Sequence, residues 1–400
     1  MKKVLFVSWQ GGMGHITRDV AIVKELHRQN PQIDVSWIAH PLACQLLRQE
    51  GEAILPESEL SADYNQAVPQ IIIGFRLDLM KYLALAGKAW AHNADVFGQI
   101  MKKHTFDLVI GDESYEVVNA MLEGKLQLPC RMIMIEDLIG VQAMSCNPLE
   151  LFGAYMRNRR LANRPARLAS RVTNLFVGEM EDVPDKPFGF RLPNRRDVAR
   201  KYYQILGYVI RFDPAEYADK FKIKAKLGYG TEPLLICATG GLCAGKELLE
   251  LCGKAYTILK RDIPDLHMIA VCGELFGTKP PKLPPGVELH TFIPDLYKHY
   301  AVCDLAVVVG GGTTTIELTA LRRPFIFFPL ENQFDQQIYI SNRLARQRAG
   351  IKMRFYETTP ESLADVIKKN IGKEATWPPI CTDGAEKAAQ LINQILNGTL

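Results

Sequence analysis

Residues 307 to 317 read VVVGGGTTTIE, and the rest of the chain is organised around the structure that they predict. Three β-branched residues are typical of a buried parallel strand, three glycines of a tight turn, and three threonines of a helix start. At such a turn, free backbone N–H groups and the positive end of the helix dipole face one point, and the glycines let a ligand come close. The stretch therefore favours a site for a phosphate-bearing ligand. An ordinary strand-to-helix turn with a threonine cap is the alternative.

Length, charge and cysteine content limit the class of protein. A chain of 400 residues exceeds the size of one hydrophobic core, so two domains are expected. The formal net charge of +4 gives no reason to expect nucleic acid as a partner. Nine cysteines without a CxxC pair or a metal-like spacing to histidine predict buried thiols of a reducing compartment and no metal site. The apolar run near the N-terminus is too short for a signal peptide or a membrane span, so we expect a cytoplasmic protein.

Strand and helix patterns alternate through two successive halves, which predicts an α/β protein with two doubly wound parallel sheets. We place the first domain at residues 1–213 and the second at 214–380. The closing segment, 381–400, is expected to be a helix, and its return to the first domain is an open alternative. Residues 57–104 are less regular, and within them a long helical stretch is expected from about residue 75 to 103.

With two such halves, each carrying a glycine-rich turn after its first strand, the chain resembles the two-domain GT-B glycosyltransferases that use nucleotide-sugar donors. The likeness is closest to the bacterial group that includes the N-acetylglucosaminyltransferase of peptidoglycan synthesis and the macrolide- and flavonoid-type enzymes. It covers nearly the whole chain and is most specific in the second half, where residues 291–295 (TFIPD), 310–317 (GGGTTTIE), Pro329 and 334–337 (FDQQ) occur in the family's order. The resemblance implies two Rossmann-like domains that face a cleft.

The resemblance assigns the donor to the second half of the chain. Ile293 would lie against the uracil, and Glu317 would accept hydrogen bonds from the ribose hydroxyls, a role that suits a carboxylate. The diphosphate would be held by the glycine turns and the threonines that follow the second of them, which are Gly240, Gly241, Gly311, Gly312, Thr313 and Thr314. The hydroxyls of the donor sugar would be contacted by Gln336 and Gln337. The alternatives are a helix-start acid that complements the dipole for Glu317, and an exposed helix start for the two glutamines.

The resemblance assigns the acceptor and the chemistry to the first half. Gly12 and Gly14 match the glycine-rich loop that faces the acceptor, and His15 occupies the position of the family's catalytic base. A histidine near its ordinary pKa can take the proton from an attacking hydroxyl. Asp112 resembles the acid that orients this histidine, and the acids that compete for this role are Glu113, Glu136 and Asp137. A loop-lining histidine and a turn acid without a chemical role are the alternatives.

The resemblance implies an inverting, metal-independent transfer from a UDP-sugar to a hydroxyl acceptor, with the nucleotide-sugar as co-substrate and no cofactor. The acceptor, a small molecule, lipid or glycan, is left open. Residues 14–18 (GHITR) also resemble the GHxxR element of UDP-sugar hydrolases of the same fold. UDP-N-acetylglucosamine 2-epimerases are more distant relatives, and a non-catalytic partner that binds UDP-sugar is a third alternative.

Residues 151–178 contain arginines without any Asp or Glu, interleaved with apolar side chains. This pattern is typical of a basic amphipathic surface that docks on anionic lipid, here at the inner face of the membrane, or on a phosphorylated acceptor. It is equally compatible with a solvated helix face whose arginines pair with acids elsewhere. The arginines in question are Arg157, Arg159, Arg160, Arg164, Arg167 and Arg171.

Overall fold

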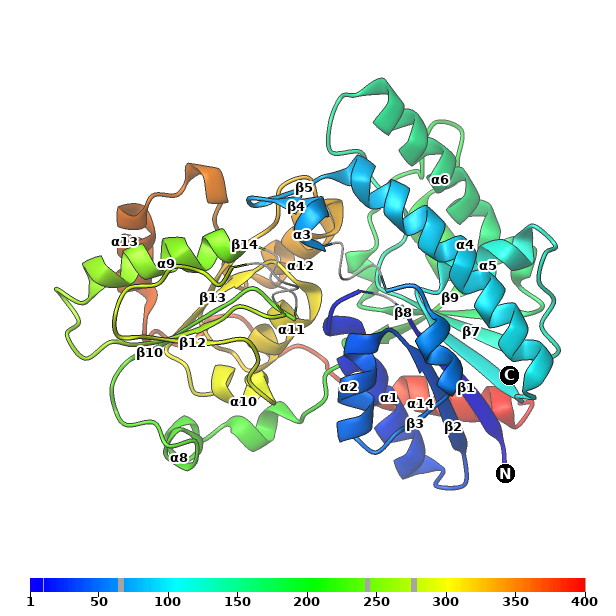
Figure 1. Cartoon of the computed structure of the whole chain (residues 1–400), viewed down its shortest axis with the longest axis horizontal. Helices are drawn as coiled ribbons and strands as arrows, with labels where there is room; N and C mark the ends of the chain where they lie inside the picture. The colour runs from blue at the N-terminus through cyan, green and yellow to red at the C-terminus, as the bar shows by residue number, and fades with distance from the viewer. Residues whose placement is uncertain (10, 64–67, 242–244, 275–278, 400) are drawn as a thin grey trace. The chain divides into compact units, whose positions relative to one another are not determined.

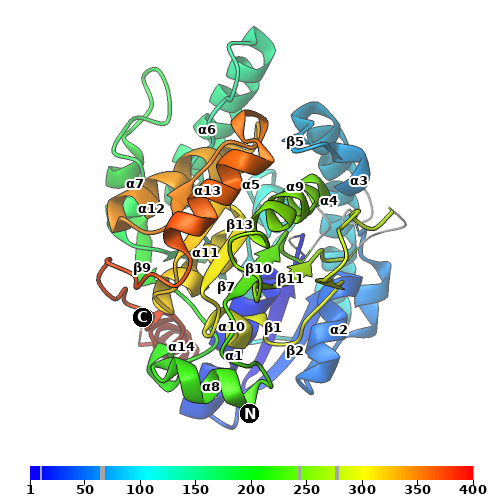
Figure 2. The ribbon, with the colours of Figure 1, turned by 90° about the vertical axis from the view of Figure 1, so that its left-hand side faces the viewer.

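The computed structural model describes residues 1–9, 11–63, 68–241, 245–274 and 279–399 (Figures 1 and 2). These residues belong to two compact units. The first consists of Met1–Asn65, Tyr82–Arg211 and Cys381–Leu400, and the second of Gln66–Lys81 and Phe212–Ile380. The division after Arg211 lies two residues before the boundary expected from the sequence. Residues 66–81, which the sequence analysis assigned to the first domain, belong to the second unit instead.

The first unit is built on a parallel sheet with the strand order β3-β2-β1-β6-β7-β8-β9. Its apolar strands are almost completely buried, as expected for a sheet that is covered on both faces. The strands are β1 (Lys3–Ser8), β2 (Asp34–Ala39), β3 (Ala53–Ile54), β6 (Leu108–Asp112), β7 (Arg131–Glu136), β8 (Val172–Val177) and β9 (Tyr203–Gly207). Because β1 pairs directly with β6, the segments that follow these two strands meet at the same edge of the sheet.

Helices cover both faces of this first sheet. Side chains of α1 and α14 share one core cluster with the strands, and side chains of α4 and α5 share another. The helices of the unit are α1 (Gly14–Gln29), α2 (Pro41–Gln49), α5 (Tyr115–Leu122), α6 (Pro148–Leu168), α7 (Arg195–Tyr202), α14 (Gly384–Leu396) and most of α4 (Leu79–Lys103). In the part of the chain that the structure describes, none of the helices is long and apolar enough to cross a membrane.

The last helix of the chain, α14, packs on α1 in the first unit (Figure 1). Its amphipathic pattern places Ala388 and Ile392 in the same buried cluster as Val20 and Leu26 of α1. Gly384 starts the helix, and a Cβ there would lie only 2.7 Å from the backbone oxygen of Tyr208. The chain therefore re-enters the first unit at a point where only glycine fits without displacement.

The second unit is built on another parallel sheet, with the order β12-β11-β10-β13-β14-β15. Its strands are β10 (Leu234–Ala238), β11 (His267–Val271), β12 (Val287–His290), β13 (Leu305–Val309), β14 (Phe325–Phe328) and β15 (Ile351–Lys352). Its helices are α3 (Val68–Ile71), α8 (Lys220–Lys226), α9 (Lys246–Leu259), α10 (Leu296–Tyr300), α11 (Gly312–Ala320), α12 (Ser341–Gln347) and α13 (Pro360–Asn370). Helices α9 and α13 lie side by side (Figure 2). Two parallel α/β sheets confirm the expected fold class.

A short antiparallel hairpin, β4 (Ile72–Ile73) with β5 (Arg76–Leu77), replaces the start of the long helix that the sequence predicted. The helix α4 begins only at Leu79. Phe75 explains the difference, because it is fully buried in the second unit, stacked on Phe355 with ring centroids 4.5 Å apart. Tertiary packing thus overrides the helical pattern of this segment.

The prediction of buried cysteine thiols holds for five of the described cysteines, which are Cys44, Cys237, Cys252, Cys272 and Cys303. It is wrong for Cys146 and Cys381, whose side chains are exposed, and Cys130 is half-buried. Cys243 lies outside the described residues.

Candidate functional site

One candidate site, in the first unit, is the turn between β1 and α1. Gly12 has a φ of +83°, a conformation that favours glycine, and it reverses the chain between strand and helix. Gly14 is the first residue of α1 and His15 the second. The histidine is half-buried, because 23% of its side chain is exposed. The turn therefore presents an imidazole at the carboxyl edge of the first sheet.

Asp112 is the acid that contacts this histidine. It ends β6, it is completely buried, and its Oδ2 lies 2.8 Å from Nδ1 of His15. Of the three competing acids, Glu136 is paired with Arg164, and Asp137 with Arg18. The sequence could name Asp112 only as one of four acids. The pairing of β1 with β6 selects it.

Arg18 holds the carboxylate of Asp112 from the other side. Its guanidinium donates to Oδ1 of Asp112 at 2.5 Å and to Asp137 at 2.8 Å, and only 7% of its side chain is exposed. Arg18 lies three residues after His15, so both side chains project from the same face of α1. Arg18 belongs to the GHxxR element, but its contact with Asp112 was not predicted from the sequence.

The charges around His15 define what its ring can do. Burial acts to raise the pKa of Asp112, but the charges of Arg18 and His15 outweigh it and hold the pKa below its ordinary value. Because Asp112 is ionised, it accepts the Nδ1 proton, and this assignment of the tautomer leaves the lone pair on Nε2. Burial, and then the Asp137 carboxylate, raise the pKa of Glu113 well above its ordinary value. The arrangement can therefore remove a proton at Nε2.

The second unit carries a candidate site of its own, the glycine turn between β13 and α11. A Cβ on Gly310 would lie 3.1 Å from Cα of Pro329, whereas Gly311 has open space at the same position. Gly311 precedes the helix without a side-chain cap. Within the described residues, the N–H groups of 312, 313 and 314 donate to no protein acceptor. These free donors at a helix N-terminus can bind an anion.

Arg343 adds positive charge to this turn. It projects from α12, and its NH2 group donates to the hydroxyl of Thr315 at 2.6 Å and to the carbonyl oxygen of Gly312 at 3.3 Å. The threonine in turn donates to the carbonyl of Gly311 at 2.8 Å. The sequence analysis did not single out Arg343, because it lies 31 residues after Gly312 and carries no motif of its own.

The other predicted donor residues follow neighbouring strands of the second sheet. Gly240 and Gly241 follow β10, which pairs with β13, and Gly240 has a φ of +90° with open space around it. Ile293 follows β12 and packs against the core of the unit. Glu317 is buried in α11, near the phenol of Tyr300. The structure thus places these residues at or near the carboxyl edge of one sheet, where parallel α/β folds bind ligands.

Gln336 and Gln337 lie in a π-helical turn, Asp335–Ile340. The Oε1 atom of Gln336 accepts from the backbone N–H of Leu330 at 2.9 Å. Nε2 of Gln337 donates to the carbonyl oxygens of Pro329 and Leu330 at 3.0 and 3.1 Å. Both amides therefore hold the loop after β14, and single π turns of this kind often occur at functional sites.

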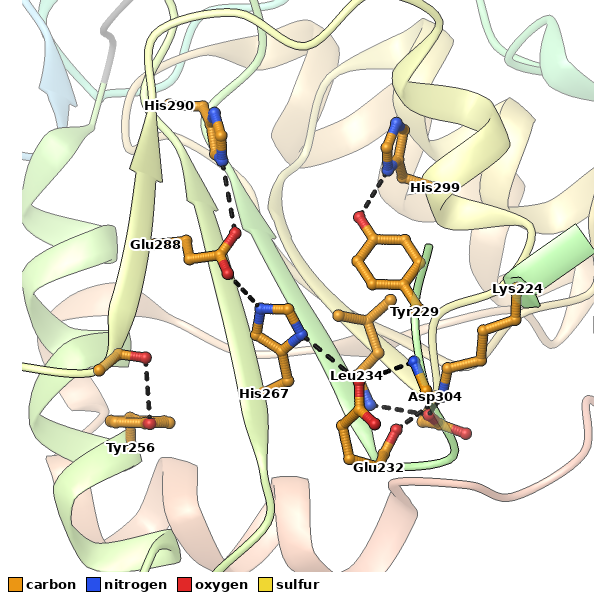
Figure 3. A network of polar contacts seen from close by, with 12 residues as sticks. Lys224, Tyr229, Glu232, Leu234, Tyr256, His267, Glu288, His290, His299 and Asp304 are labelled. Carbon is orange, nitrogen blue, oxygen red and sulfur yellow. Dashed lines mark hydrogen bonds and ion pairs between the residues drawn. The ribbon is translucent and has the colours of Figure 1, made fainter. Parts of the chain in front are cut away.

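A polar network lines the edge strand β12 (Figure 3). Glu288 accepts a hydrogen bond from Nε2 of His267 at 2.8 Å and lies 3.6 Å from His290. Beside it, the hydroxyl of Tyr229 lies 2.6 Å from Nδ1 of His299. The network ends at His290, which directly precedes the predicted base-binding loop. None of its residues has a sequence motif that would have indicated it.

The arginine-rich segment is the helix α6, and its arginines do not share one surface. Arg164 is 3% exposed and paired with Glu136, which excludes it from a docking face. Arg157 lies over the rings of Trp90 and Tyr115. Arg167 and Arg171 donate to backbone carbonyls of Leu122 and Leu128. Of these six arginines, only Arg159 and Arg160 are exposed and have side chains without a partner among the described residues. The prediction of one six-arginine surface is therefore wrong for Arg164.

Comparisons with known proteins show which family and which fold this chain shares. The model of the glycosyltransferase family 28 C-terminal domain matches residues 235–395. An uncharacterized glycosyltransferase of Methanosarcina acetivorans is 30% identical over 394 residues, with 94% of this chain and 89% of the relative covered. The UDP-N-acetylglucosamine--N-acetylmuramyl-(pentapeptide) pyrophosphoryl-undecaprenol N-acetylglucosamine transferase of Glaesserella parasuis is 25% identical over 222 residues, which cover 55% of this chain and 60% of that enzyme. Among solved structures, the glycotransferase of kitacinnamycin has a TM-score of 0.59 at 15% identity and covers 99% of this chain and 95% of its own.

Proposed function

This chain belongs to the nucleotide-sugar glycosyltransferases of GT-B fold, and we propose that it is an inverting enzyme that moves a sugar from a UDP-sugar to a hydroxyl group of its acceptor. The observation that carries the proposal is the contact of 2.8 Å between His15 and the buried Asp112. With Nδ1 bound to the carboxylate, Nε2 takes the proton of the acceptor hydroxyl while that oxygen attacks the anomeric carbon. Direct attack from the side opposite the nucleotide inverts the anomeric configuration.

The second unit would bind the donor. The N–H groups of Gly312, Thr313 and Thr314 and the charge of Arg343 stabilise the diphosphate as it leaves. This makes the transfer metal-independent in our proposal, and turnover is expected to persist in EDTA. Gln336 and Gln337 would contribute to donor-sugar binding indirectly, because their amides hold the loop after β14 in place.

The decisive experiment incubates the purified protein with UDP-, GDP- and dTDP-sugars, with and without a panel of hydroxyl acceptors. Transfer to an acceptor, with a β-glycoside formed from an α-linked donor, supports the proposal, and NMR of the product reads the anomeric configuration. A retained anomer would contradict the role of His15. Release of free sugar at the same rate without acceptor would instead identify a UDP-sugar hydrolase, the alternative that the GHxxR element suggests.

Replacement of Glu317 by Gln tests the donor site. We expect the affinity for UDP to fall about tenfold, because a hydrogen bond to a charged group contributes about 1.5–3 kcal/mol. The preference for UDP over 2′-deoxy-UDP should fall as well, since the proposed partner is the ribose diol. Titration calorimetry measures both. Glu361→Gln, at an exposed acid in the first turn of α13, is the control. Unchanged UDP affinity in Glu317→Gln would remove this residue from the site.

We also propose a peripheral contact with anionic membrane, through a surface that differs from the six predicted arginines. The first turns of α6 expose Leu149, Leu151 and Phe152, whose exposed fractions are 75%, 50% and 64%. The hydroxyl of Tyr155 lies 3.5 Å from the carbonyl of Phe190, another exposed aromatic residue, so the two segments are neighbours. Arg159 and Arg160 follow on the same helix. Apolar side chains beside free cations favour an anionic lipid surface.

A double change, Leu149→Ser with Phe152→Ser, is expected to reduce co-sedimentation with phosphatidylglycerol vesicles severalfold. The wild-type protein should bind less as salt is raised, because the cations are exposed. Phe221→Ser is the matched control, because this phenylalanine is 81% exposed on α8 of the second unit. Equal loss in both variants, or salt-insensitive binding, would contradict the proposed surface.

A further inference from the structure

Arg157 is a half-buried cation that lies over two aromatic rings. Its guanidinium carbon lies 5.4 Å from the ring centroid of Trp90 and 5.7 Å from that of Tyr115. Among the residues that the structure describes, this guanidinium forms no hydrogen bond and no ion pair. Arginine is rarely buried without a partner, because burial removes the water that accepts hydrogen bonds from its N–H groups and no protein acceptor replaces that water. The rings fix the guanidinium in place but cannot accept its donors as a carboxylate would.

The acids near Arg157 are already engaged. Glu136 accepts from Arg164, and the hydroxyl of Tyr203 donates to the same carboxylate oxygen at 3.0 Å. Glu113 shares a side-chain hydrogen bond with Asp137. Among the described residues, neither acid forms an ion pair with Arg157, so the donors of its guanidinium are available to a ligand.

The segments that position Arg157 are the same ones that position the catalytic acid. Tyr115 follows Asp112 by three residues, and its backbone N–H donates to the carbonyl of Glu113 at 2.7 Å. On α6, the neighbouring Asn158 clamps the loop after β7, accepting from the N–H of Val141 at 2.8 Å and donating to its carbonyl at 2.9 Å. Arg157 is therefore held at the edge of the first sheet that carries His15 and Asp112.

Positive charge accumulates on the same loop. The carbonyl oxygen of Val141 also accepts from Arg195 at 2.8 Å. Lys186 donates to Gln142, the next residue of the loop. Burial, and then the charge of Arg195, lower the pKa of Lys186.

From these contacts we propose that Arg157 binds an anionic group, a phosphate or a carboxylate, that is carried by the acceptor. The proposal rests on the transferase function proposed above and narrows its acceptor to an anionic alcohol. Aromatic rings beside a guanidinium fix the orientation of its plane. Two parallel N–H groups of the guanidinium can then donate to two oxygens of one phosphate or carboxylate. The anion would replace the water that the half-buried guanidinium has lost.

The first test measures anion binding with the donor site filled. The full-length protein is saturated with UDP, which occupies the glycine turn of the second unit, and is then titrated calorimetrically with inorganic phosphate or with acetate at low salt. We expect the wild type to bind one of these two probes, which also distinguishes a phosphate site from a carboxylate site. Arg157→Met should weaken this binding at least about tenfold. Methionine keeps an unbranched stem between the rings, so the fold should persist.

Arg160→Met is the matched control, because Arg160 is exposed one turn further along α6 and has no partner among the described residues. It should leave phosphate and acetate binding unchanged. UDP affinity, measured in the same titrations, should be equal in all three proteins, and equal midpoints of urea unfolding should report that the first unit is intact. Equal anion binding by the wild type and Arg157→Met, or no binding of either probe by the wild type, would overturn the proposal.

The second test compares two acceptors that differ only in charge, glycerol and glycerol 3-phosphate, or glycerol and glycerate if the carboxylate is preferred. The wild type should transfer sugar faster to the charged member, and Arg157→Met should lose this preference. If the wild type consumes no nucleotide-sugar at all, the transferase function fails, whereas Arg157-dependent anion binding would still stand. If donor is consumed without any preference for charge, the acceptor proposal alone fails.

Discussion

A His15→Gln variant is expected to lose about 10²- to 10⁴-fold in kcat, the usual contribution of a positioned general base. The affinity for UDP should stay the same, because His15 belongs to the first unit and the free N–H groups of the glycine turn belong to the second. Glutamine keeps a polar side chain that Arg18 and Asp112 can contact, so the buried charges remain compensated. Stopped-time assays of sugar transfer, together with UDP titrations, separate the two effects.

The pH profile gives an independent check on the same residue. In the wild type, kcat should fall at acid pH, because a protonated Nε2 cannot accept the proton of the acceptor. This acidic limb should be absent from the residual activity of His15→Gln. His27→Gln, in the last turn of the same helix, is the control and should behave as the wild type does. If His15→Gln retains full turnover, another group is the base.

The two glycine turns were predictable from the sequence because their signal is local. A strand, a glycine turn and a helix start occupy neighbouring positions, and their residue types satisfy the backbone geometry directly. The acid that pairs with His15 could not be predicted in this way, because it is distant from His15 in the sequence. Asp112 is 97 residues away, and three further acids had equal claims until the sheet order placed β6 beside β1. The sequence motif predicts His15 as the base, but it does not identify Asp112 as the acid that pairs with it.

The arginines of α6 show why charge patterns are ambiguous. From sequence, Arg157, Arg159 and Arg164 are alike, yet one lies between aromatic rings, one is exposed and one is buried in an ion pair. The difference depends on Glu136, Trp90 and Tyr115, which come from other elements and carry no helical spacing to α6. The hairpin around Phe75 escaped prediction for the same reason, since its packing against Phe355 joins residues 280 positions apart.

Replacement of Arg164 by Met is expected to destabilise the protein by about 3–5 kcal/mol, the cost of leaving a buried charge unpaired. The side chains of Arg164 and Glu136 are 3% and 1% exposed, so water cannot replace the lost partner. The hydroxyl of Tyr203, which accepts from Arg164 at 2.9 Å and donates to Glu136, is the only remaining donor to that carboxylate among the recorded contacts. The midpoint of urea unfolding, followed by fluorescence and circular dichroism, measures the effect.

The double variant Arg164→Met with Glu136→Met distinguishes an ion pair from simple packing. Removing both charges should recover much of the stability, because two apolar side chains of similar volume can replace a buried pair at little net cost. Arg160→Met, at an exposed position of the same helix, should change the free energy of unfolding by less than about 0.5 kcal/mol. A different result would be an Arg164→Met variant that is as stable as the wild type but has lost its affinity for anionic vesicles. The guanidinium of Arg164 would then have to be exposed in solution, and the prediction of an arginine surface on α6 that docks on lipid would be supported. The burial of Arg164 argues for the opposite result, with the loss confined to stability.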